Sequence, residues 1–370
     1  MRLLLVSHSI QEWTKYFSRY FKESGTETLV ASFSPKNIEG IKTEFLAGPE
    51  YNALKDKHCY FTSVPKLRKI IKRFNPDVVM AVYLASNGLT AALSWKGPLL
   101  VCAVGSDVLE RGYRKSFSIS LRNLLIKFVS RKADLINSVS TEISDKLKKL
   151  GVPESKILEM PFGVDTKTFY PAENMPRACP RKFICTRAHK LVYDIPTVIE
   201  ALSILKQKNV PFHCIFTSDG PELEKHKNMV KEKDLRDCVD FTGFLEHDVL
   251  PRALREADIY ISASIGDGTS VSLLEAMATG LFPVVSNIRA NAPWVEHGIT
   301  GLLFETGNSE DLAQKLQQAV NDDKIQKNAG KKNRELIKQK CDIHTNMNVL
   351  AQKLQELANS AKDRYNQPRL

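Results

Sequence analysis

The sequence lacks a long apolar run. No stretch approaches the roughly 18–20 consecutive apolar residues that cross a bilayer as a helix. The apolar start, Met1–Val6, is short, and Ser7-His8-Ser9 follows it without the small-residue pattern of a signal-peptide cleavage site. We therefore interpret residues 3–7 as a buried strand and expect the protein in the cytoplasm.

The spacings typical of disulfide frameworks and metal sites are also missing. The seven cysteines are an odd number without a C-x-x-C pair, the eight histidines show no H-x-x-x-H pattern, and no D-x-D motif is placed to bind a metal. Cys102, Cys185 and Cys214 lie in apolar, strand-like runs. We expect reduced thiols in the core, and neither a disulfide framework nor a zinc site.

Acidic residues are scarce in the first half of the chain. The net charge is +11; residues 1–175 carry 26 Lys and Arg against 17 Asp and Glu, whereas the remainder carries 27 against 25. This excess favours an anionic partner, such as a membrane surface, a phosphorylated acceptor or nucleic acid. A merely soluble basic protein is an equal alternative. Because the sequence has no recognisable nucleic-acid reader motif, we expect no nucleic-acid partner.

The sequence does have a repeated alternation of apolar and amphipathic runs. Its 370 residues exceed one ordinary core and indicate two domains. In the first half, the strand-like runs are residues 3–7, 28–33, 77–82, 98–104 and 135–139. Helical patterns between them cover residues 11–24, 65–74 and 118–130. This alternation predicts a parallel sheet wrapped by helices.

The same alternation restarts after a proline-containing stretch. The later strand-like runs are residues 183–186, 212–217, 238–242, 259–263, 282–286 and 301–304. The later helical patterns are residues 195–208, 223–233, 247–256, 270–279, 309–322 and 342–365. We predict two doubly wound, Rossmann-like α/β domains, residues 1–170 and 181–341, which face a central cleft and are joined by a linker at 171–180. A C-terminal helix within residues 342–370 can cross back to the first domain.

The segment Ser264–Gly280 carries the most chemical information. It follows a strand that ends near Ala263, and a helix begins near Ser270. Unpaired backbone N–H groups at such a helix start favour an anion such as a diphosphate. Asp267 in the loop and Glu275 in the helix can accept hydrogen bonds from sugar or ribose hydroxyls. The plain alternative is an N-capped helix with a solvated glutamate.

This segment resembles a known motif. An acid at 267, Glu275 eight residues later, the run Ala276-Met-Ala-x-Gly280 and then Pro283-Val-Val resemble the donor site of glycosyltransferase family 4, whose members have the two-Rossmann GT-B fold. Further resemblances occur in order along nearly the whole chain. They are Gly105-Ser-Asp107, Pro161–Phe169, Asp219-Gly-Pro221 and Gly298–Phe304.

The resemblance implies roles for individual residues. Glu275 would hold the nucleotide ribose, and Asp267 would contact hydroxyls of the transferred sugar. Arg187 would pair with the diphosphate, together with the backbone of Gly268, Thr269 and Ser270.

On the same resemblance, Asp107 would face the acceptor side of the cleft. The donor would be a UDP- or GDP-type sugar. The reaction would retain configuration and need no metal or other cofactor.

Three departures from the family pattern stand out. The first acid is Asp267 where the family usually has Glu. The family's Lys about five residues after the Arg is missing, and Lys190, at a different spacing, is its candidate replacement. The N-terminal Gly-Gly loop is replaced by Ser7–Ile10, in which His8 either approaches the cleft or is a plain loop residue.

Two basic helical patterns in the first half have two interpretations each. Pro65–Phe74 places Leu67, Ile70, Ile71 and Phe74 on one face with cations elsewhere. Residues 111–132 mix seven cations with apolar residues: Arg111, Arg114, Lys115, Arg122, Lys127, Arg131 and Lys132. Such helices either dock on an anionic membrane, which would place the protein on its inner face, or pack their apolar stripe on the sheet.

The favoured function is therefore a retaining glycosyltransferase that acts on a glycan or lipid-linked acceptor in polysaccharide or lipopolysaccharide biosynthesis. A sugar-nucleotide epimerase on the same fold is a weaker alternative, because the motifs match a transferase along the chain. A non-catalytic, nucleotide-sugar-binding partner subunit of another transferase stays open, because of Asp267 and the missing Lys.

Overall fold

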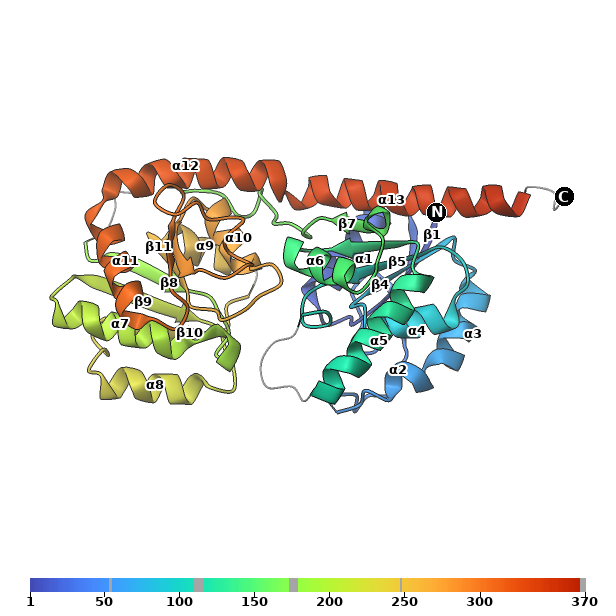
Figure 1. Cartoon of the computed structure of the whole chain (residues 1–370), viewed down its shortest axis with the longest axis horizontal. Coiled ribbons are helices and arrows are strands. Elements are labelled where there is room, and N and C mark those ends of the chain that lie inside the picture. The colour runs from blue at the N-terminus through green and yellow to red at the C-terminus, as the bar shows by residue number, and fades with distance from the viewer. Residues whose placement is uncertain (53–54, 110–115, 173–178, 247, 367–370) are drawn as a thin grey trace. The chain divides into compact units, whose positions relative to one another are not determined.

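The computed structural model describes residues 1–52, 55–109, 116–172, 179–246 and 248–366. The chain divides into two compact units (Figure 1). The N-terminal unit comprises Met1–Phe162 and Thr345–Leu370, and the C-terminal unit comprises Gly163–His344. Of the predicted linker, residues 173–178 lie outside the described part of the chain.

The N-terminal unit contains a seven-stranded sheet in the order β3-β2-β1-β4-β5-β6-β7, with every pair parallel. Its strands are β1 (Arg2–Ser7), β2 (Glu27–Ser32), β3 (Lys42–Phe45), β4 (Val78–Val82), β5 (Leu99–Ala103), β6 (Leu135–Ser138) and β7 (Ile157–Glu159). Its helices are α1 (Glu12–Glu23), α2 (Cys59–Thr62), α3 (Val64–Phe74), α4 (Asn87–Ser94), α5 (Ser116–Lys132) and α6 (Thr141–Lys149).

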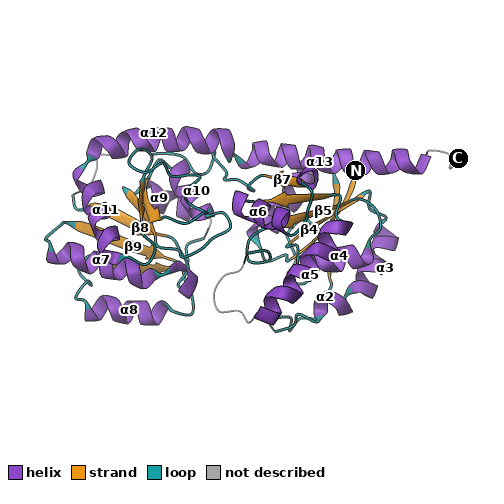
Figure 2. Cartoon of the chain, viewed as in Figure 1, coloured by secondary structure: helices purple, strands orange, loops and turns teal. Residues whose placement is uncertain are grey.

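The C-terminal unit contains a six-stranded parallel sheet in the order β10-β9-β8-β11-β12-β13. Its strands are β8 (Arg181–Cys185), β9 (Phe212–Thr217), β10 (Val239–Gly243), β11 (Ile259–Ser262), β12 (Phe282–Ser286) and β13 (Leu302–Phe304). Its helices are α7 (Ile195–Gln207), α8 (Leu223–Glu232), α9 (Leu250–Arg255), α10 (Val271–Ala278), α11 (Ser309–Asn321) and α12 (Asp323–Lys340). Figure 2 shows the helices of each unit arranged around its strands.

Both sheets follow the doubly wound pattern. The chain starts each sheet in the middle, with β1 or β8, and winds first to one side and then to the other. The order therefore reverses between β1 and β4 and between β8 and β11, and ligands of such sheets bind at the carboxyl ends of the strands at these points. The predicted pair of doubly wound α/β units is confirmed.

All predicted strands are present within two residues of the expected ends, but two further strands were missed. β3 is polar and half-exposed, and β7 has three residues; β3 and β7 form the two edges of the N-terminal sheet. Edge strands are short and polar because one side meets water, so they lack the apolar signal of central strands. The helices α2, α4, α6 and α12 were also not predicted.

Helix α13 (Ile343–Asn366) begins in the C-terminal unit and continues as part of the N-terminal one. Within the N-terminal unit, the hydroxyl of Tyr20 donates to Asn348, and Lys362 forms an ion pair of 3.1 Å with Asp77. Among the helices in the described ranges, none is both long and apolar enough to span a bilayer.

All seven cysteines are free thiols, and Cys102, Cys185, Cys214 and Cys341 are buried. The predicted reduced core thiols are therefore confirmed.

The two helical patterns rich in lysine and arginine, α3 and α5, differ in where their apolar side chains lie. In α3 the apolar stripe of Leu67, Ile70, Ile71 and Phe74 is buried in the core, so for this helix the packing interpretation is confirmed.

The two chain segments at the boundary of the C-terminal unit run beside each other. The N–H of Val164 donates to the carbonyl of Cys341 (2.8 Å), and the N–H of Ile343 donates back to Val164 (3.0 Å). Gly163 adopts a φ of +105°, and a Cβ there would lie 2.7 Å from the Cα of Ile343. Only glycine fits this position, because a side chain is excluded by both the backbone angle and the neighbouring chain.

Candidate functional site

Two strand ends of the C-terminal unit place the central residues of the site. Arg187 follows β8 by two residues, and Asp267 follows β11 by five. Since β8 and β11 are neighbours at the point where strand order reverses, their carboxyl ends share the crevice in which doubly wound sheets bind ligands. Arg187 and Asp267, which are eighty residues apart in the sequence, are therefore in contact.

Several contacts converge on the guanidinium of Arg187 at this strand end. It is 7% exposed, and its Nη2 pairs with Oδ2 of Asp267. Its Nη1 donates to the hydroxyls of Ser272 (2.7 Å) and Ser270 (3.3 Å), and its Cζ lies 3.9 Å from the ring centroid of Tyr193. Burial opposes the charge, but Asp267 and the two tyrosines Tyr260 and Tyr193 outweigh it and raise the pKa of Arg187.

Helix α10 begins at this guanidinium. Its N-cap residue is Ser270, but the Ser270 side chain makes no capping hydrogen bond to the helix and instead accepts one from Arg187. Ser272 in the first turn links Arg187 to the hydroxyl of Tyr260 (2.9 Å). The carboxylate of Asp267 also accepts the N–H of Gly268 (2.9 Å). A buried cation and a helix N-terminus thus adjoin, and both favour an anion.

Glu275 lies in α10 three residues after Ser272 and so on the same face of the helix. Its side chain is half-buried. Burial raises the pKa of Glu275 to about 8, although the charge of Arg187 opposes that rise. The alternative of a fully solvated glutamate on a capped helix does not describe this residue.

The turn after β9 supports the loop that carries Arg187. The N–H of His189 donates to Asp219 (3.0 Å), and the N–H of Glu222 donates to the carbonyl of His189 (3.0 Å). A Cβ at Gly220 would lie 2.4 Å from that carbonyl oxygen, so the approach requires glycine. The Asp219-Gly-Pro motif therefore positions the Arg187 loop.

Comparison with known proteins decides the relationship. The model of group 1 glycosyl transferases matches residues 172–336, and the model of glycosyltransferase family 4 matches residues 10–168. The chain contains a glycosyltransferase family 4 domain followed by a group 1 glycosyl transferase domain. The resemblance inferred from the motifs is confirmed.

Two of the curated relatives of this chain are bacterial glycosyltransferases. The putative colanic acid biosynthesis glycosyltransferase WcaL of Escherichia coli is 28% identical over 66% of this chain and 60% of its own length. The N,N'-diacetylbacillosaminyl-diphospho-undecaprenol alpha-1,3-N-acetylgalactosaminyltransferase of Campylobacter jejuni is 26% identical over 72% of this chain and 73% of its own. The chain thus spans about 60% of the length of WcaL.

Solved structures share the fold of this family member. Sucrose-phosphate synthase from Thermosynechococcus elongatus matches with a TM-score of 0.84 at 17% identity, over 97% of this chain and 100% of that one. Anabaena HepE in complex with UDP and glucose matches with a TM-score of 0.78 at 16% identity, over 96% and 99% of the two chains. These similarities show the GT-B fold.

The contacts of Lys190 and Thr269, two residues expected at the donor site, do not test their predicted roles. Lys190 is exposed, and its side chain makes no hydrogen bond or ion pair with any residue in the described ranges. The carbonyl of Thr269 accepts the N–H of Val271 (3.0 Å). Their expected contacts with the diphosphate stay predictions.

Sequence reasoning missed several residues around the donor site of this family member. Tyr193, Tyr260 and Ser272 contact Arg187 directly or through one hydroxyl. Position gave a signal for Ser272, which lies in the first turn of α10, whereas Tyr260 lies inside β11 and Tyr193 lies eight residues after the end of β8.

In the N-terminal unit, the carboxylate of Asp107 accepts hydrogen bonds from backbone N–H groups. Its two carboxylate oxygens accept the N–H groups of Leu84 (2.6 Å), Val104 (3.1 Å) and Gly105 (2.8 Å). Burial raises the pKa of Asp107, and these hydrogen bonds oppose the rise. The side chain therefore ties the loop after β4 to the loop after β5, and its expected place on the acceptor side stays a prediction.

His8 follows β1 and is buried. Its Nδ1 lies 3.2 Å from the hydroxyl of Ser34, and its ring is stacked against Tyr51 with 5.9 Å between the centroids. Burial lowers the pKa of His8 to about 4, so the imidazole is neutral at pH 7. His8 is therefore packed in an aromatic cluster and is not a solvated loop residue.

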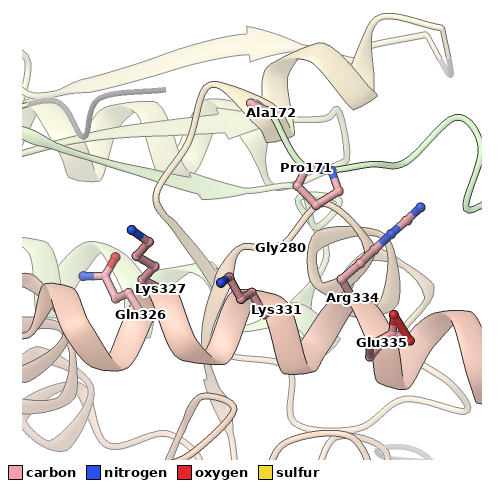
Figure 3. A pocket seen from close by; sticks show the side chains of 9 residues that line it. Pro171, Ala172, Gly280, Gln326, Lys327, Lys331, Arg334 and Glu335 are labelled. Carbon is pink, nitrogen blue, oxygen red and sulfur yellow. The ribbon is translucent and has the colours of Figure 1, made fainter. Parts of the chain in front are cut away.

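The C-terminal unit also contains a pocket of about 450 Å³ (Figure 3). It is lined by Pro171, Ala172, Gly280, Gln326, Lys327, Gly330, Lys331, Arg334 and Glu335. Gly280 lies two residues before β12, so the pocket lies at the amino-terminal edge of the strands, away from Arg187. The guanidinium of Arg334 donates to the carbonyls of Thr166 (2.6 Å) and Ala278 (3.1 Å), so it fastens the end of α10.

Proposed function

We propose that this protein transfers a sugar from a nucleotide-diphosphate sugar to a glycan acceptor carried on a lipid, in the synthesis of a bacterial surface polysaccharide. Family membership supports glycosyl transfer. The names of two relatives support the pathway and the acceptor, because one refers to colanic acid and the other to an undecaprenol diphosphate. The fold neighbour HepE holds UDP, which supports a nucleotide donor.

The buried guanidinium of Arg187 at the start of α10 is the observation that carries this proposal. A diphosphate placed there would replace Asp267 as the partner of the cation. Charge that develops on the leaving phosphate would meet donors that are already oriented by Ser270, Ser272 and Tyr193, so little reorganisation is needed during the reaction.

Asp267 and Glu275 would bind the two sugars of the donor. Once the diphosphate takes over Arg187, the Asp267 carboxylate is released to accept hydrogen bonds from the transferred sugar. Glu275 faces the same way as Ser272 and would accept hydrogen bonds from the ribose hydroxyls. Ionised Glu275 accepts two such bonds, whereas the protonated acid must use one oxygen as a donor.

We propose a retaining, metal-independent reaction. The bond between the anomeric carbon and the phosphate oxygen breaks, and a bond to the acceptor oxygen forms on the same face of the sugar. The acceptor hydroxyl gives its proton to the departing phosphate oxygen, so no protein nucleophile is needed. Product anomers resolved by NMR, and activity measured in a chelator, test these two features.

A nucleotide-sugar-binding partner subunit is the second candidate. The side chain of Asp267 is one methylene shorter than the family's Glu and is held by Arg187. Turnover by the purified protein with a lipid-linked acceptor separates the candidates, because a partner subunit would bind the donor without consuming it.

Calorimetric titration with a panel of UDP- and GDP-sugars tests the donor site. We expect one nucleotide sugar to bind the wild type, and Arg187→Ala to weaken that binding about 100-fold, because two or more charge-assisted hydrogen bonds are lost. Glu275→Ala should weaken it about tenfold. The control is Arg236→Ala, which removes an exposed arginine elsewhere in the C-terminal unit. Binding that survives both site substitutions would place the donor elsewhere.

A further inference from the structure

Helix α5 turns leucines outward. Leu121 and Leu124 are 49% and 62% exposed, and Leu125 and Phe128 on the same side are only partly buried. The opposite side of the helix holds Ile126 and Val129, which are fully buried and face the core. The outward side therefore carries its own apolar stripe, which we call the α5 stripe.

The rotation of α5 about its axis is fixed by a cation. Arg122 is 7% exposed, and its Nη1 donates to the carbonyl of Leu109 (3.0 Å). It lies on the inward side with Ile126 and Val129 at intervals of three and four residues. An arginine inside and leucines outside reverse the usual distribution, because burying the leucines would have stabilised the fold more.

Cations flank the α5 stripe. Lys127, Arg131 and Lys132 are exposed in the last turns of the helix, and Arg131 lies seven residues from Leu124, hence near the same side. No Asp or Glu occurs in α5. The cations Arg111, Arg114 and Lys115 of the same basic segment lie outside the described residues.

The contrast with α3 shows that charge alone does not distinguish this surface. Helix α3 is also basic, but its apolar stripe of Leu67, Ile70, Ile71 and Phe74 is buried. Among the two basic helices identified from the sequence, α5 is the one that presents both apolar side chains and cations to the outside.

We propose that the α5 stripe docks on the surface of an anionic lipid bilayer. Exposed leucines enter the boundary between headgroups and acyl chains, while Lys127, Arg131 and Lys132 meet the phosphates. Charge complementarity favours this occupant, because the first 175 residues carry most of the net charge of +11. A second protein is less suitable, since a stable interface buries roughly 800 Å² on each partner and this stripe is short.

This inference rests on the proposed function for its purpose: a lipid-linked acceptor is held in the surface on which α5 would dock. Its evidence is separate, because the α5 stripe belongs to the N-terminal unit and the donor site to the C-terminal one. A test of vesicle binding therefore needs neither a known acceptor nor catalytic turnover.

Flotation of the full chain with vesicles tests the proposal. One set of vesicles contains phosphatidylglycerol and phosphatidylcholine, and the other contains phosphatidylcholine alone. We expect binding to the anionic set, at least tenfold weaker binding to the neutral set, and further weakening in high salt because exposed charges are screened.

Two double variants separate the apolar and the charged parts of the surface. Leu121→Gln with Leu124→Gln keeps the charge and the helix propensity, and Lys127→Glu with Arg131→Glu keeps the leucines. Each pair should weaken vesicle binding at least tenfold. The charge control, Lys324→Glu with Lys332→Glu on exposed positions of α12, makes the same change in net charge and should weaken it less than threefold.

Three results would overturn the proposal. The first is equal binding to neutral and anionic vesicles, and the second is wild-type binding by either α5 variant. The third is a leucine-dependent dimer in sedimentation that accounts for the stripe without lipid. Nucleotide-sugar affinity and thermal melting of the same variants should match the wild type, so a failure of the donor assignment cannot be mistaken for a failure of docking.

Discussion

Arg187 and Asp267 form an ion pair at the carboxyl edge of the C-terminal sheet, where only 7% and 13% of their side chains are exposed. The pair joins the loop after β8 to the loop after β11, the two strands between which the chain reverses direction across the sheet. The ion pair compensates each of these two buried charges. The arrangement also holds the cation where we propose that the donor diphosphate binds.

The pair makes the two charges interdependent for stability. Arg187→Gln alone leaves Asp267 buried without its cation and should lower the free energy of unfolding by about 3 kcal/mol. The double variant Arg187→Gln with Asp267→Asn removes both charges and should lose about half as much or less. Urea unfolding of the two single variants and the double variant measures the coupling. Additive losses would show that the pair contributes no coupling.

Glu275 makes stability depend on pH. Burial raises its pKa from 4.5 to about 8, so between these values the folded protein binds a proton that the unfolded chain does not. The free energy of unfolding should therefore fall as the pH rises from 4.5 to 8. Glu275→Gln should be close to wild type at pH 5 and more stable by about 1 kcal/mol or more at pH 8.5.

Urea unfolding at pH 5, 6, 7 and 8.5 measures this difference. The control is Glu232→Gln, the same substitution at the exposed end of α8. A difference between Glu275→Gln and the wild type that stays constant with pH would contradict the raised pKa of Glu275.

Gly163 tests how tightly the boundary segments of the C-terminal unit fit. Gly163→Ala combines an unfavourable φ with a Cβ 2.7 Å from Ile343, and should destabilise the unit by about 3 kcal/mol. Gly307 is the matched control, since its φ of +79° is also left-handed but no atom lies within 4 Å of a Cβ there. Gly307→Ala should cost about 1 kcal/mol in the same thermal-unfolding measurement.

Asp107 should act through loop geometry. Asp107→Ala leaves the N–H groups of Leu84, Val104 and Gly105 without their acceptor and should destabilise the protein by about 2–3 kcal/mol. Nucleotide-sugar affinity of the folded variant should stay within about threefold of wild type, because the donor site belongs to the other unit. A variant of wild-type stability would show that these three hydrogen bonds are dispensable.

The sequence predicted the central strands well because they are buried on both faces and read as short apolar runs. β9 and β12 have the predicted ends, whereas the edge strands β3 and β7 were missed. The site residues Arg187 and Asp267 were found through motifs. Their mutual ion pair was not, because spacing along the chain says which strand end a residue follows but not which side chain it meets.

The basic helices α3 and α5 also separate what the sequence determines from what the tertiary structure determines. The sequence by itself determined that α3 and α5 would be amphipathic and rich in lysine and arginine, because a period of 3.6 and residue type are local properties. Only the tertiary structure decided that α3 buries its apolar stripe while α5 turns Leu121 and Leu124 outward. The rotation of a helix about its axis depends on the residues against which it packs, and for α5 these include the buried contact of Arg122 with Leu109.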